Sequence, residues 1–150
     1  ERMGEIGSWS DVKLLTVKVD RLRRWARPGF VAIGDAAHAM SPVGGVGINL
    51  AVQDAVAAAN LLARPLRGGT VTLADLEAVQ RRREFPMKVI QTIQIAVQRN
   101  LIDRLLTAQK PLRAPWLLRT IAAIPPLRAI PAYVVGVGIR PEHIRVTETR

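Results

Sequence analysis

Between residues 30 and 60 a short apolar run, a glycine-rich loop and an alanine-rich segment follow one another, and this order limits the possible folds more than any other feature of the sequence. Residues 30–33 are apolar and stand between two glycines, which predicts a short buried strand. Residues 34–47 are rich in Gly, Ala and Pro and predict a loop. Residues 49–63 have apolar side chains at helical spacing and predict a helix that ends near Pro65. This order favours an α/β fold.

The predicted loop also carries the residues from which a ligand site could be built. Asp35 stands directly after the predicted strand, where open α/β sheets bind ligands, and its carboxylate can accept hydrogen bonds from sugar hydroxyls. Gly44, Gly45 and Gly47 allow the backbone to approach a ligand closely. The helix begins just after them, and its first N–H groups and its dipole favour an electron-rich ligand group. Together these features predict a cofactor cradle without naming the cofactor.

The flanking segments predict a mostly helical chain with two or three strands. Residues 12–19 are apolar and β-branched in rough alternation, which indicates a strand. Residues 20–28 are basic and predict a turn or a short helix. A second helix is expected to begin near Thr72 and to be kinked or broken at Pro86, and a third amphipathic helix is expected over residues 87–108.

Residues 111–138 differ from the rest because they are apolar but interrupted by prolines and isolated arginines. Residues 116–124 and 129–137 could form short helices. Neither run reaches the roughly 20 apolar residues that a membrane-spanning helix needs. We favour a tail that packs on a larger protein body, and peripheral contact with a membrane surface stays open as an alternative.

The formal net charge of +10 would suit a protein that binds nucleic acid or an anionic membrane. The basic residues are spread along the chain, however, and the tightest runs, at residues 21–27 and 81–83, stand beside acidic residues. An arginine-rich, solvent-exposed surface is therefore the preferred interpretation, and no nucleic-acid partner is expected. The absence of cysteine excludes disulfides and cysteine nucleophiles and fits a cytoplasmic protein. His38 and His143 stand too far apart, without a carboxylate cluster, to predict a metal site.

The loop resembles the second flavin-binding motif of the aromatic-hydroxylase class of FAD-dependent monooxygenases, the p-hydroxybenzoate hydroxylase-like family. The matching residues are Gly34-Asp35-Ala36-Ala37-His38, Ser41-Pro42, Gly45, Gly47, Asn49 and Asp54-Ala55. The organisation of residues 12–106 is compatible with the resemblance, whereas the last part of the chain matches only loosely.

The resemblance implies that this loop binds FAD. Asp35 would bind a ribityl hydroxyl, and Pro42, the catalytic candidate, would place its carbonyl near the substrate-side face of the isoalloxazine ring. The glycines would let the loop pass close to the ring, and the N–H groups of Ile48 and Asn49 would contact its pyrimidine end. The complete set expected at the cofactor is Gly34, Asp35, Pro42, Gly45, Val46, Gly47, Ile48 and Asn49. His38 is expected to be structural, and Asp54 is expected to cap or pair near the helix rather than contact the cofactor.

The resemblance also implies the organisation and the reaction. Residues 1–20 would end a substrate-domain sheet, residues 21–110 would form the C-terminal part of a Rossmann-like FAD-binding domain with its following helices, and residues 111–150 would form an apolar, proline-rich tail. NAD(P)H would reduce FAD, and O2 would then be used to hydroxylate an aromatic or polyketide-like small molecule.

The chain has no G-x-G-x-x-G unit for the ADP half of FAD. The missing N-terminal part of the same protein is therefore an expected partner, and this chain alone should bind FAD weakly or not at all. Two other classes stay open. One is a membrane-associated flavoprotein that reduces or epoxidises isoprenoid lipids. The other is a basic nucleic-acid-binding module, which ranks low because the chain has no recognisable helix-turn-helix or aromatic RNA-binding motif.

Overall fold

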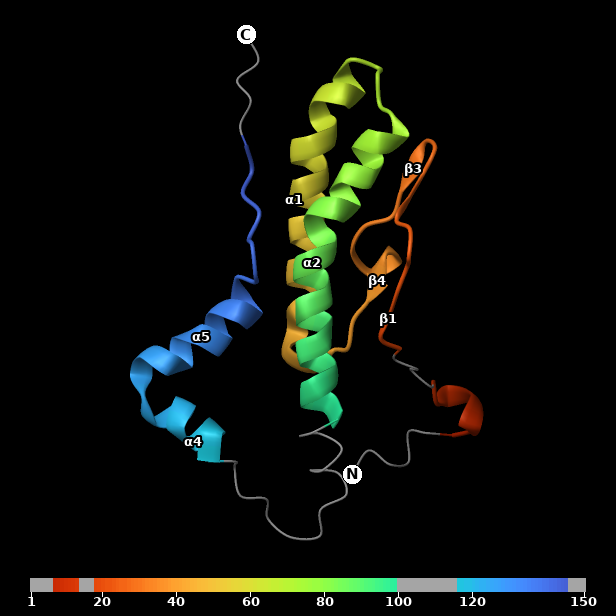
Figure 1. Ribbon diagram of the computed structural model, residues 1–150. Helices are drawn as coiled ribbons and strands as arrows, with labels where there is room; N and C mark the ends of the chain where they lie inside the picture. Colours follow the sequence, from red (N-terminus) through yellow and green to blue (C-terminus); the bar gives the residue numbers. More distant parts are fainter. Residues whose placement is uncertain (1–6, 14–17, 100–115, 146–150) are drawn as a thin grey trace.

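The structure is a computed structural model that describes residues 7–13, 18–99 and 116–145. Its largest part is a pair of long helices that lie side by side, α1 (Val46–Arg67) and α2 (Leu73–Val97) (Figure 1). The turn between them includes Gly69, whose φ of 64° lies in the left-handed region that glycine favours. Because this turn is short, the two helices run antiparallel.

Four strands of two residues each form two antiparallel ribbons in the described part of the chain. β1 (Asp20–Arg21) pairs with β4 (His38–Ala39), and β2 (Ala26–Arg27) pairs with β3 (Phe30–Val31). The β2–β3 turn contains Gly29 at a φ of 75°. The described residues also form three 3₁₀ turns, η2 (Trp9–Asp11), η3 (Gly34–Ala36) and η4 (Val43–Gly45).

The core lies where the two ribbons pack against the helix pair (Figure 1). Its buried residues form three clusters, namely Trp25, Ala32, Ala37 and Met87, then Ala26, Leu62, Leu76 and Val79, and finally Val46, Leu50 and Ile90. Each cluster joins residues that are far apart in the sequence. The burial of these apolar side chains fixes the loop between β3 and α1 against both helices.

The C-terminal part of the chain returns to the helix pair. After α4 (Trp116–Ala123) and α5 (Pro125–Gly136), residues 137–145 run along α1 in an extended path (Figure 1). We call residues 137–145 the C-terminal strap. Polar side chains of α1 hold its backbone. Gln53 Nε2 donates to the Val137 carbonyl at 2.7 Å, and Asn60 Nδ2 donates to the His143 carbonyl at 2.8 Å.

Several predicted elements are present, although their bounds differ from the predicted ones. The described chain is mostly helical with a few short strands, the helix after the glycine-rich loop is present, and the tail contains two short helices. The helix α1 begins at Val46, three residues before its predicted start, and continues through Pro65 to Arg67. The described strands number four rather than two or three.

The strand predictions were partly wrong. Residues 12, 13, 18 and 19 lie outside any strand, and residues 14–17 are outside the described residues. Strands β1 and β2 occur instead in the basic segment 20–28, where a turn or short helix was expected. Phe30 is 59% exposed, so the expected buried strand is buried only from its later residues. β1 forms because it pairs with residues 38–39, a distant partner that local composition does not reveal, whereas β2 forms a short hairpin with β3.

A kink or a break was expected at Pro86, and the helix does not break there. Pro86 lies inside α2, so the predicted second and third helices are one helix as far as Val97, and the predicted continuation over residues 100–108 lies outside the described residues. Proline removes one backbone donor and usually disrupts a helix interior. Here its ring is fully buried, and this packing contributes stability that offsets the lost hydrogen bond.

Candidate cofactor-binding site

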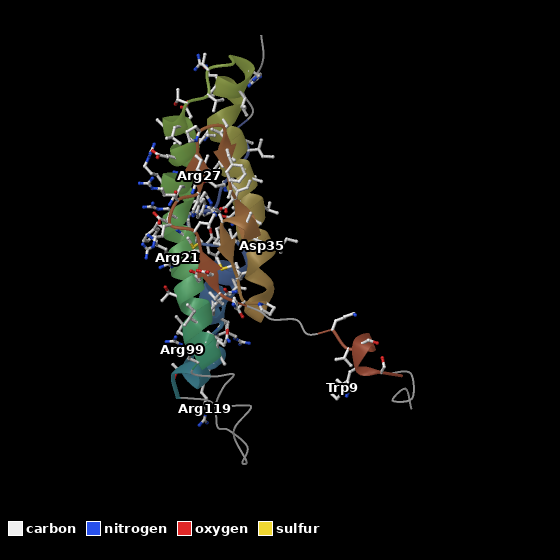
Figure 2. All side chains as sticks on the ribbon, turned by 90° about the vertical axis from the view of Figure 1, so that its right-hand side faces the viewer. Trp9, Arg21, Arg27, Asp35, Arg99 and Arg119 are labelled. Carbon is white, nitrogen blue, oxygen red and sulfur yellow. The ribbon has the colours of Figure 1, made fainter. Side chains whose placement is uncertain are left out.

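An open hollow of about 420 Å³ lies where the glycine-rich loop meets the start of α1. Its lining consists of Asp35, Met40, Ser41, Pro42, Gly45, Gly47 and Ile48. Five of the eight residues predicted at the cofactor are therefore brought together here. Asp35 is solvent-exposed and lies beside α1 (Figure 2). Ile48 is 71% exposed, so a large apolar side chain borders the hollow without a cover in the described chain.

The start of α1 is open toward this hollow. The residue before the helix is Gly45, which has a left-handed φ of 61° and provides no side-chain cap. The usual helical pattern leaves the N–H groups of Gly47 and Ile48 without an acceptor in α1, whereas the preceding 3₁₀ turn η4 provides one for Val46. The same pattern gives the N–H of Asn49 an acceptor inside the helix. N–H groups that α1 does not satisfy internally and the positive end of the helix dipole therefore lie next to the hollow, which suits an electron-rich ligand group.

Two glycines of the loop are required for different reasons. Gly34 has a φ of 59°, and a Cβ atom there would lie 3.0 Å from the Cβ of Ala51. Gly34 thus lets η3 pack directly on α1. Gly47 has no positive φ, but a Cβ atom there would lie 3.4 Å from the Cβ of Met40 and 3.9 Å from Oδ1 of Asp35. The missing side chain of Gly47 therefore leaves room inside the hollow.

The other three predicted cofactor residues lie elsewhere. Gly34 is buried at the start of the loop, and Val46 is 5% exposed and belongs to the core. The side chain of Asn49 is directed at the tail, where its Nδ2 donates to the carbonyls of Val135 and Gly136 at 3.4 Å each. These residues can shape the site, and their contact with a cofactor stays a prediction.

A buried polar network lies directly beneath the loop. The carboxylate of Asp54 is fully buried, and its Oδ2 accepts a hydrogen bond from the Gly34 N–H at 3.1 Å and lies 2.6 Å from Nε2 of His38. His38 is also buried and stacks near Trp25, with ring centroids 5.2 Å apart. The pairing role expected for Asp54 and the structural role expected for His38 are therefore confirmed.

The network contains one residue that sequence reasoning missed. Arg83 has 0% exposure, and its Nε donates to Oδ1 of Asp54 at 2.9 Å. It was grouped with Arg81 and Arg82 as a basic surface run, and the side chain of Arg81 is indeed 63% exposed. Helical spacing could have separated them, because Arg83 stands four residues after Val79 and four before Met87, on the buried face of α2.

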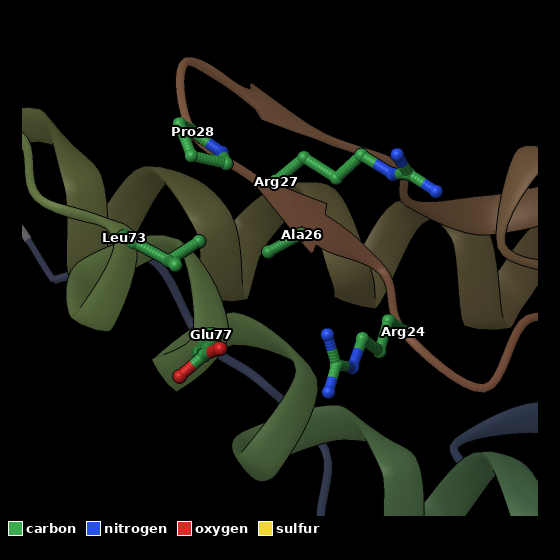
Figure 3. A pocket seen from close by; sticks show the side chains of 6 residues that line it. All are labelled: Arg24, Ala26, Arg27, Pro28, Leu73 and Glu77. Carbon is green, nitrogen blue, oxygen red and sulfur yellow. The ribbon is translucent and has the colours of Figure 1, made fainter.

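A second hollow, of about 300 Å³, lies between the β2–β3 ribbon and the start of α2. Its lining is Arg24, Ala26, Arg27, Pro28, Leu73 and Glu77 (Figure 3). Arg27 extends away from Leu73 and Glu77 in this view. None of the residues predicted at the cofactor lines this second hollow, so it is separate from the candidate site.

The described residues provide neither a metal site nor clear support for a membrane span. No group of three or more His, Cys, Asp or Glu side chains there could hold a metal ion. Among the described helices only α1 is long and apolar enough to cross a membrane. Core helices of soluble proteins meet the same criteria, and α1 packs against α2 and buries the charged Asp54, so this is weak support for a membrane span.

Comparison with known proteins agrees with the cofactor cradle. Residues 6–93 match the family model described as FAD binding domain. The chain is 40% identical over 128 residues to 6-methylpretetramide 4-monooxygenase of Streptomyces rimosus. The aligned region covers 84% of this chain and 31% of that protein. The chain is also 35% identical over 63 residues to an uncharacterized protein of Synechocystis sp.. That alignment covers 42% of this chain and 15% of the Synechocystis protein. The chain thus spans less than a third of the length of these curated relatives.

The family match extends over more than half of the chain. It includes the whole glycine-rich loop, all of α1 and the part of α2 that contains Arg83. The structure and the comparison therefore agree on the same region. The chain belongs to the FAD binding domain family, within the aromatic-hydroxylase class of FAD-dependent flavoproteins.

Proposed function

We propose that the protein containing this chain is a FAD-dependent monooxygenase that hydroxylates an aromatic or polyketide-like small molecule with NAD(P)H and O2. The observation that carries the proposal is the hollow at the uncapped start of α1, lined by the family's motif residues. The similarity to a 4-monooxygenase of 6-methylpretetramide supports the reaction and the substrate class. A cytoplasmic location and a Rossmann-like FAD domain completed by other parts of the protein belong to the same proposal.

The residues of the hollow fit the isoalloxazine and ribityl parts of FAD. Gly47 leaves space where a Cβ atom would otherwise stand within 3.9 Å of the Asp35 carboxylate. Asp35 would accept hydrogen bonds from a ribityl hydroxyl, and the N–H groups at the start of α1 would bind the electron-rich edge of the ring. Pro42, on the rim, would contact the face of the ring toward the substrate.

Each of these residues would act by binding, orientation or exclusion of water. The dipole of α1 would stabilise negative charge that develops beside Gly47 and Ile48, because its positive end points there. Met40 and Ile48 would provide apolar surface that keeps water from the ring. Bound FAD would supply the redox chemistry that moves electrons from NAD(P)H to O2 and one oxygen atom to the substrate.

The two alternative classes are not favoured. Neither relative that the comparison names is described as a lipid-modifying or nucleic-acid-binding protein. The exposed arginines of α2 include ones paired with acidic side chains, such as Arg81 with Glu77 at 3.7 Å. Such pairing fits an ordinary solvated surface better than a phosphate-binding face.

The first test is the visible absorption spectrum of the full-length protein as purified, beside its Asp35→Ala variant. We expect a flavin spectrum in the unchanged protein and an affinity for FAD that is on the order of tenfold weaker in the variant, because a charged hydrogen-bond acceptor is lost. Glu77→Ala, which removes a carboxylate outside the hollow, serves as the control and should bind FAD normally.

A full-length protein that stays colourless with added FAD would overturn the proposal. Normal FAD binding by Asp35→Ala would leave the family assignment intact and would refute the role of Asp35. The substrate class is tested by NAD(P)H oxidation in the presence of aromatic and polyketide-like compounds, 6-methylpretetramide among them, with product hydroxylation as the readout.

A further inference from the structure

The C-terminal strap and the glycine-rich loop are connected through a continuous set of buried and partly buried contacts. We propose that the strap holds Arg83 in place, that Arg83 holds Asp54, and that Asp54 fixes the turn that presents Asp35. Arg83, Asp54 and the strap are then positioning elements of the cofactor site. This inference rests on the proposed function, and it concerns a segment beyond residues 6–93, which the family model covers.

The first connection lies between Asp54 and the loop. Oδ2 of Asp54 accepts from the Gly34 N–H and contacts Nε2 of His38, so one carboxylate oxygen fixes the backbone before Asp35 and the side chain three residues after it. Gly34 and Ala37 are closed into one turn by the Ala37 N–H to Gly34 carbonyl bond at 2.9 Å. The direction of Asp35 therefore depends on the position of Asp54.

The second connection lies between Asp54 and Arg83. A buried carboxylate needs a compensating charge, and Arg83 provides it at 2.9 Å with both side chains fully buried. Arg83 also uses a second donor, because its NH2 group bonds to Oε1 of Gln53 at 3.1 Å. The guanidinium is therefore held from two sides by α1, and its third side remains for another partner.

The third connection lies between Arg83 and the strap. The NH1 group of Arg83 donates to the Arg140 carbonyl at 3.2 Å and lies 3.8 Å from Oε1 of Glu142. Glu142 has a side-chain exposure of 5% and also accepts from Nε of Arg82 at 2.6 Å, a hydrogen bond that raises the pKa of Arg82. The strap thus supplies the last acceptor and a second negative charge to the buried arginine.

The strap holds a defined conformation at this contact. Arg140 has a φ of 59°, a conformation that non-glycine residues rarely adopt, and its guanidinium lies 5.0 Å from the ring centre of Phe85. A strained residue persists when its surroundings over-determine it. Here the surroundings are α2 itself, through Arg83 and Phe85, so the strap is fixed to the residues that support the loop.

The test uses the full-length protein and FAD as the probe, with affinity and the visible circular dichroism of bound flavin as readouts. Arg83→Met should weaken FAD binding on the order of tenfold and change the dichroism, because it leaves Asp54 buried without its counter-charge. Arg83→Lys should retain part of the affinity. Asp54→Asn combined with Arg83→Met should recover part of it, since neutral Asn can still accept from Gly34. Arg81→Met, the surface control, should behave as the unchanged protein.

The strap itself is tested without flavin. We expect Glu142→Ala to speed amide hydrogen exchange in residues 33–40, whereas Glu77→Ala, which removes a carboxylate from a surface pair, should not. Unchanged exchange in Glu142→Ala together with unchanged FAD affinity in Arg83→Lys and Arg83→Met would overturn the inference and leave the proposed function standing. If the unchanged protein binds no FAD, the proposed function fails, and the exchange experiment still decides whether the strap fixes the loop. If Arg83→Met does not fold, Arg83→Lys and Glu142→Ala decide the question.

Discussion

At the scale of single residues, two glycines of this region serve different purposes, since Gly34 is needed for folding and Gly47 leaves space for the cofactor. Gly34 combines a left-handed φ with close contact to Ala51, so both its conformation and its missing side chain are needed for folding. Gly47 lies in α1 at ordinary helical φ, where alanine would be a better helix former. Backbone conformation therefore does not require glycine at this position. The space that the missing side chain leaves in the hollow explains it.

Gly34→Ala should reduce the free energy of unfolding by about 3 kcal/mol, as the sum of a left-handed alanine and overpacking against Ala51. Gly29→Ala is the matched control, because Gly29 has a φ of 75° but nothing within 4 Å of an added Cβ. It should cost only about 1 kcal/mol. Urea denaturation of both variants gives the comparison, and equal losses would contradict the close contact at Ala51.

Gly47→Ala should leave the stability equal or raise it by about 0.5 kcal/mol, because alanine has the higher helix propensity. The same change should weaken FAD binding, since the new methyl group would occupy the hollow between Met40 and Asp35. Thermal denaturation without flavin and a FAD titration measure the two effects. A variant that binds FAD normally would show that the ring does not enter this part of the hollow.

At the scale of elements, α2 begins with a capping box. The Asp75 N–H donates to the Thr72 hydroxyl at 3.3 Å, and the Thr72 N–H donates to the Asp75 carboxylate at 2.9 Å. The hydroxyl of Thr72 also donates to this carboxylate and lowers the pKa of Asp75 below its ordinary value of 3.8. Reciprocal capping satisfies N–H groups that the helix cannot satisfy internally.

Thr72→Ala should destabilise the fold by about 1 kcal/mol through loss of the cap. Because the pKa of folded Asp75 lies below 3.8, its contribution to stability is complete above that pH and is lost as the pH falls through the lowered pKa. The difference between the unchanged protein and Thr72→Ala should therefore shrink on acidification below pH 3.8. Melting curves at neutral and acidic pH test this, and a constant difference would count against the capping box.

At the scale of the whole molecule, long-range polar contacts join the tail to the helix pair. Asn60 binds the strap twice, by donation to the His143 carbonyl at 2.8 Å and by acceptance from the Arg145 N–H at 3.0 Å. Both contacts are exposed to solvent and therefore contribute little to global stability. Their effect is to keep the end of the chain against α1.

Asn60→Ala should release the end of the strap. Trypsin should then cleave after Arg145 several-fold faster, while the stability changes by about 1 kcal/mol or less. Mass spectrometry of timed digests identifies the cleavage sites. Gln98→Ala, an exposed change at the end of α2, is the control, and equal cleavage of both variants would show that Asn60 does not hold the strap.

Part of this molecule could be predicted from local sequence, and the particular residues show why. The helical content, the place of α1 and the five motif residues of the hollow were predicted, because helix periodicity and glycine-rich loops depend on neighbouring residues. The strands at residues 20–27 and the burial of Arg83 were missed. Strand β1 is paired with residues 38–39, and Arg83 is buried by Asp54, so both depend on partners far along the chain.

The sequence by itself identified the family, because the motif residues that carry the resemblance to FAD-dependent aromatic hydroxylases stand close together between residues 34 and 55. Only the tertiary structure decided which of three adjacent arginines on α2 lies in the interior and that the strap returns to it. A single arginine can be buried only where carboxylates and carbonyls from other segments meet its charge and its donors. Those partners, Asp54, Gln53 and Arg140, come together only when the chain is folded.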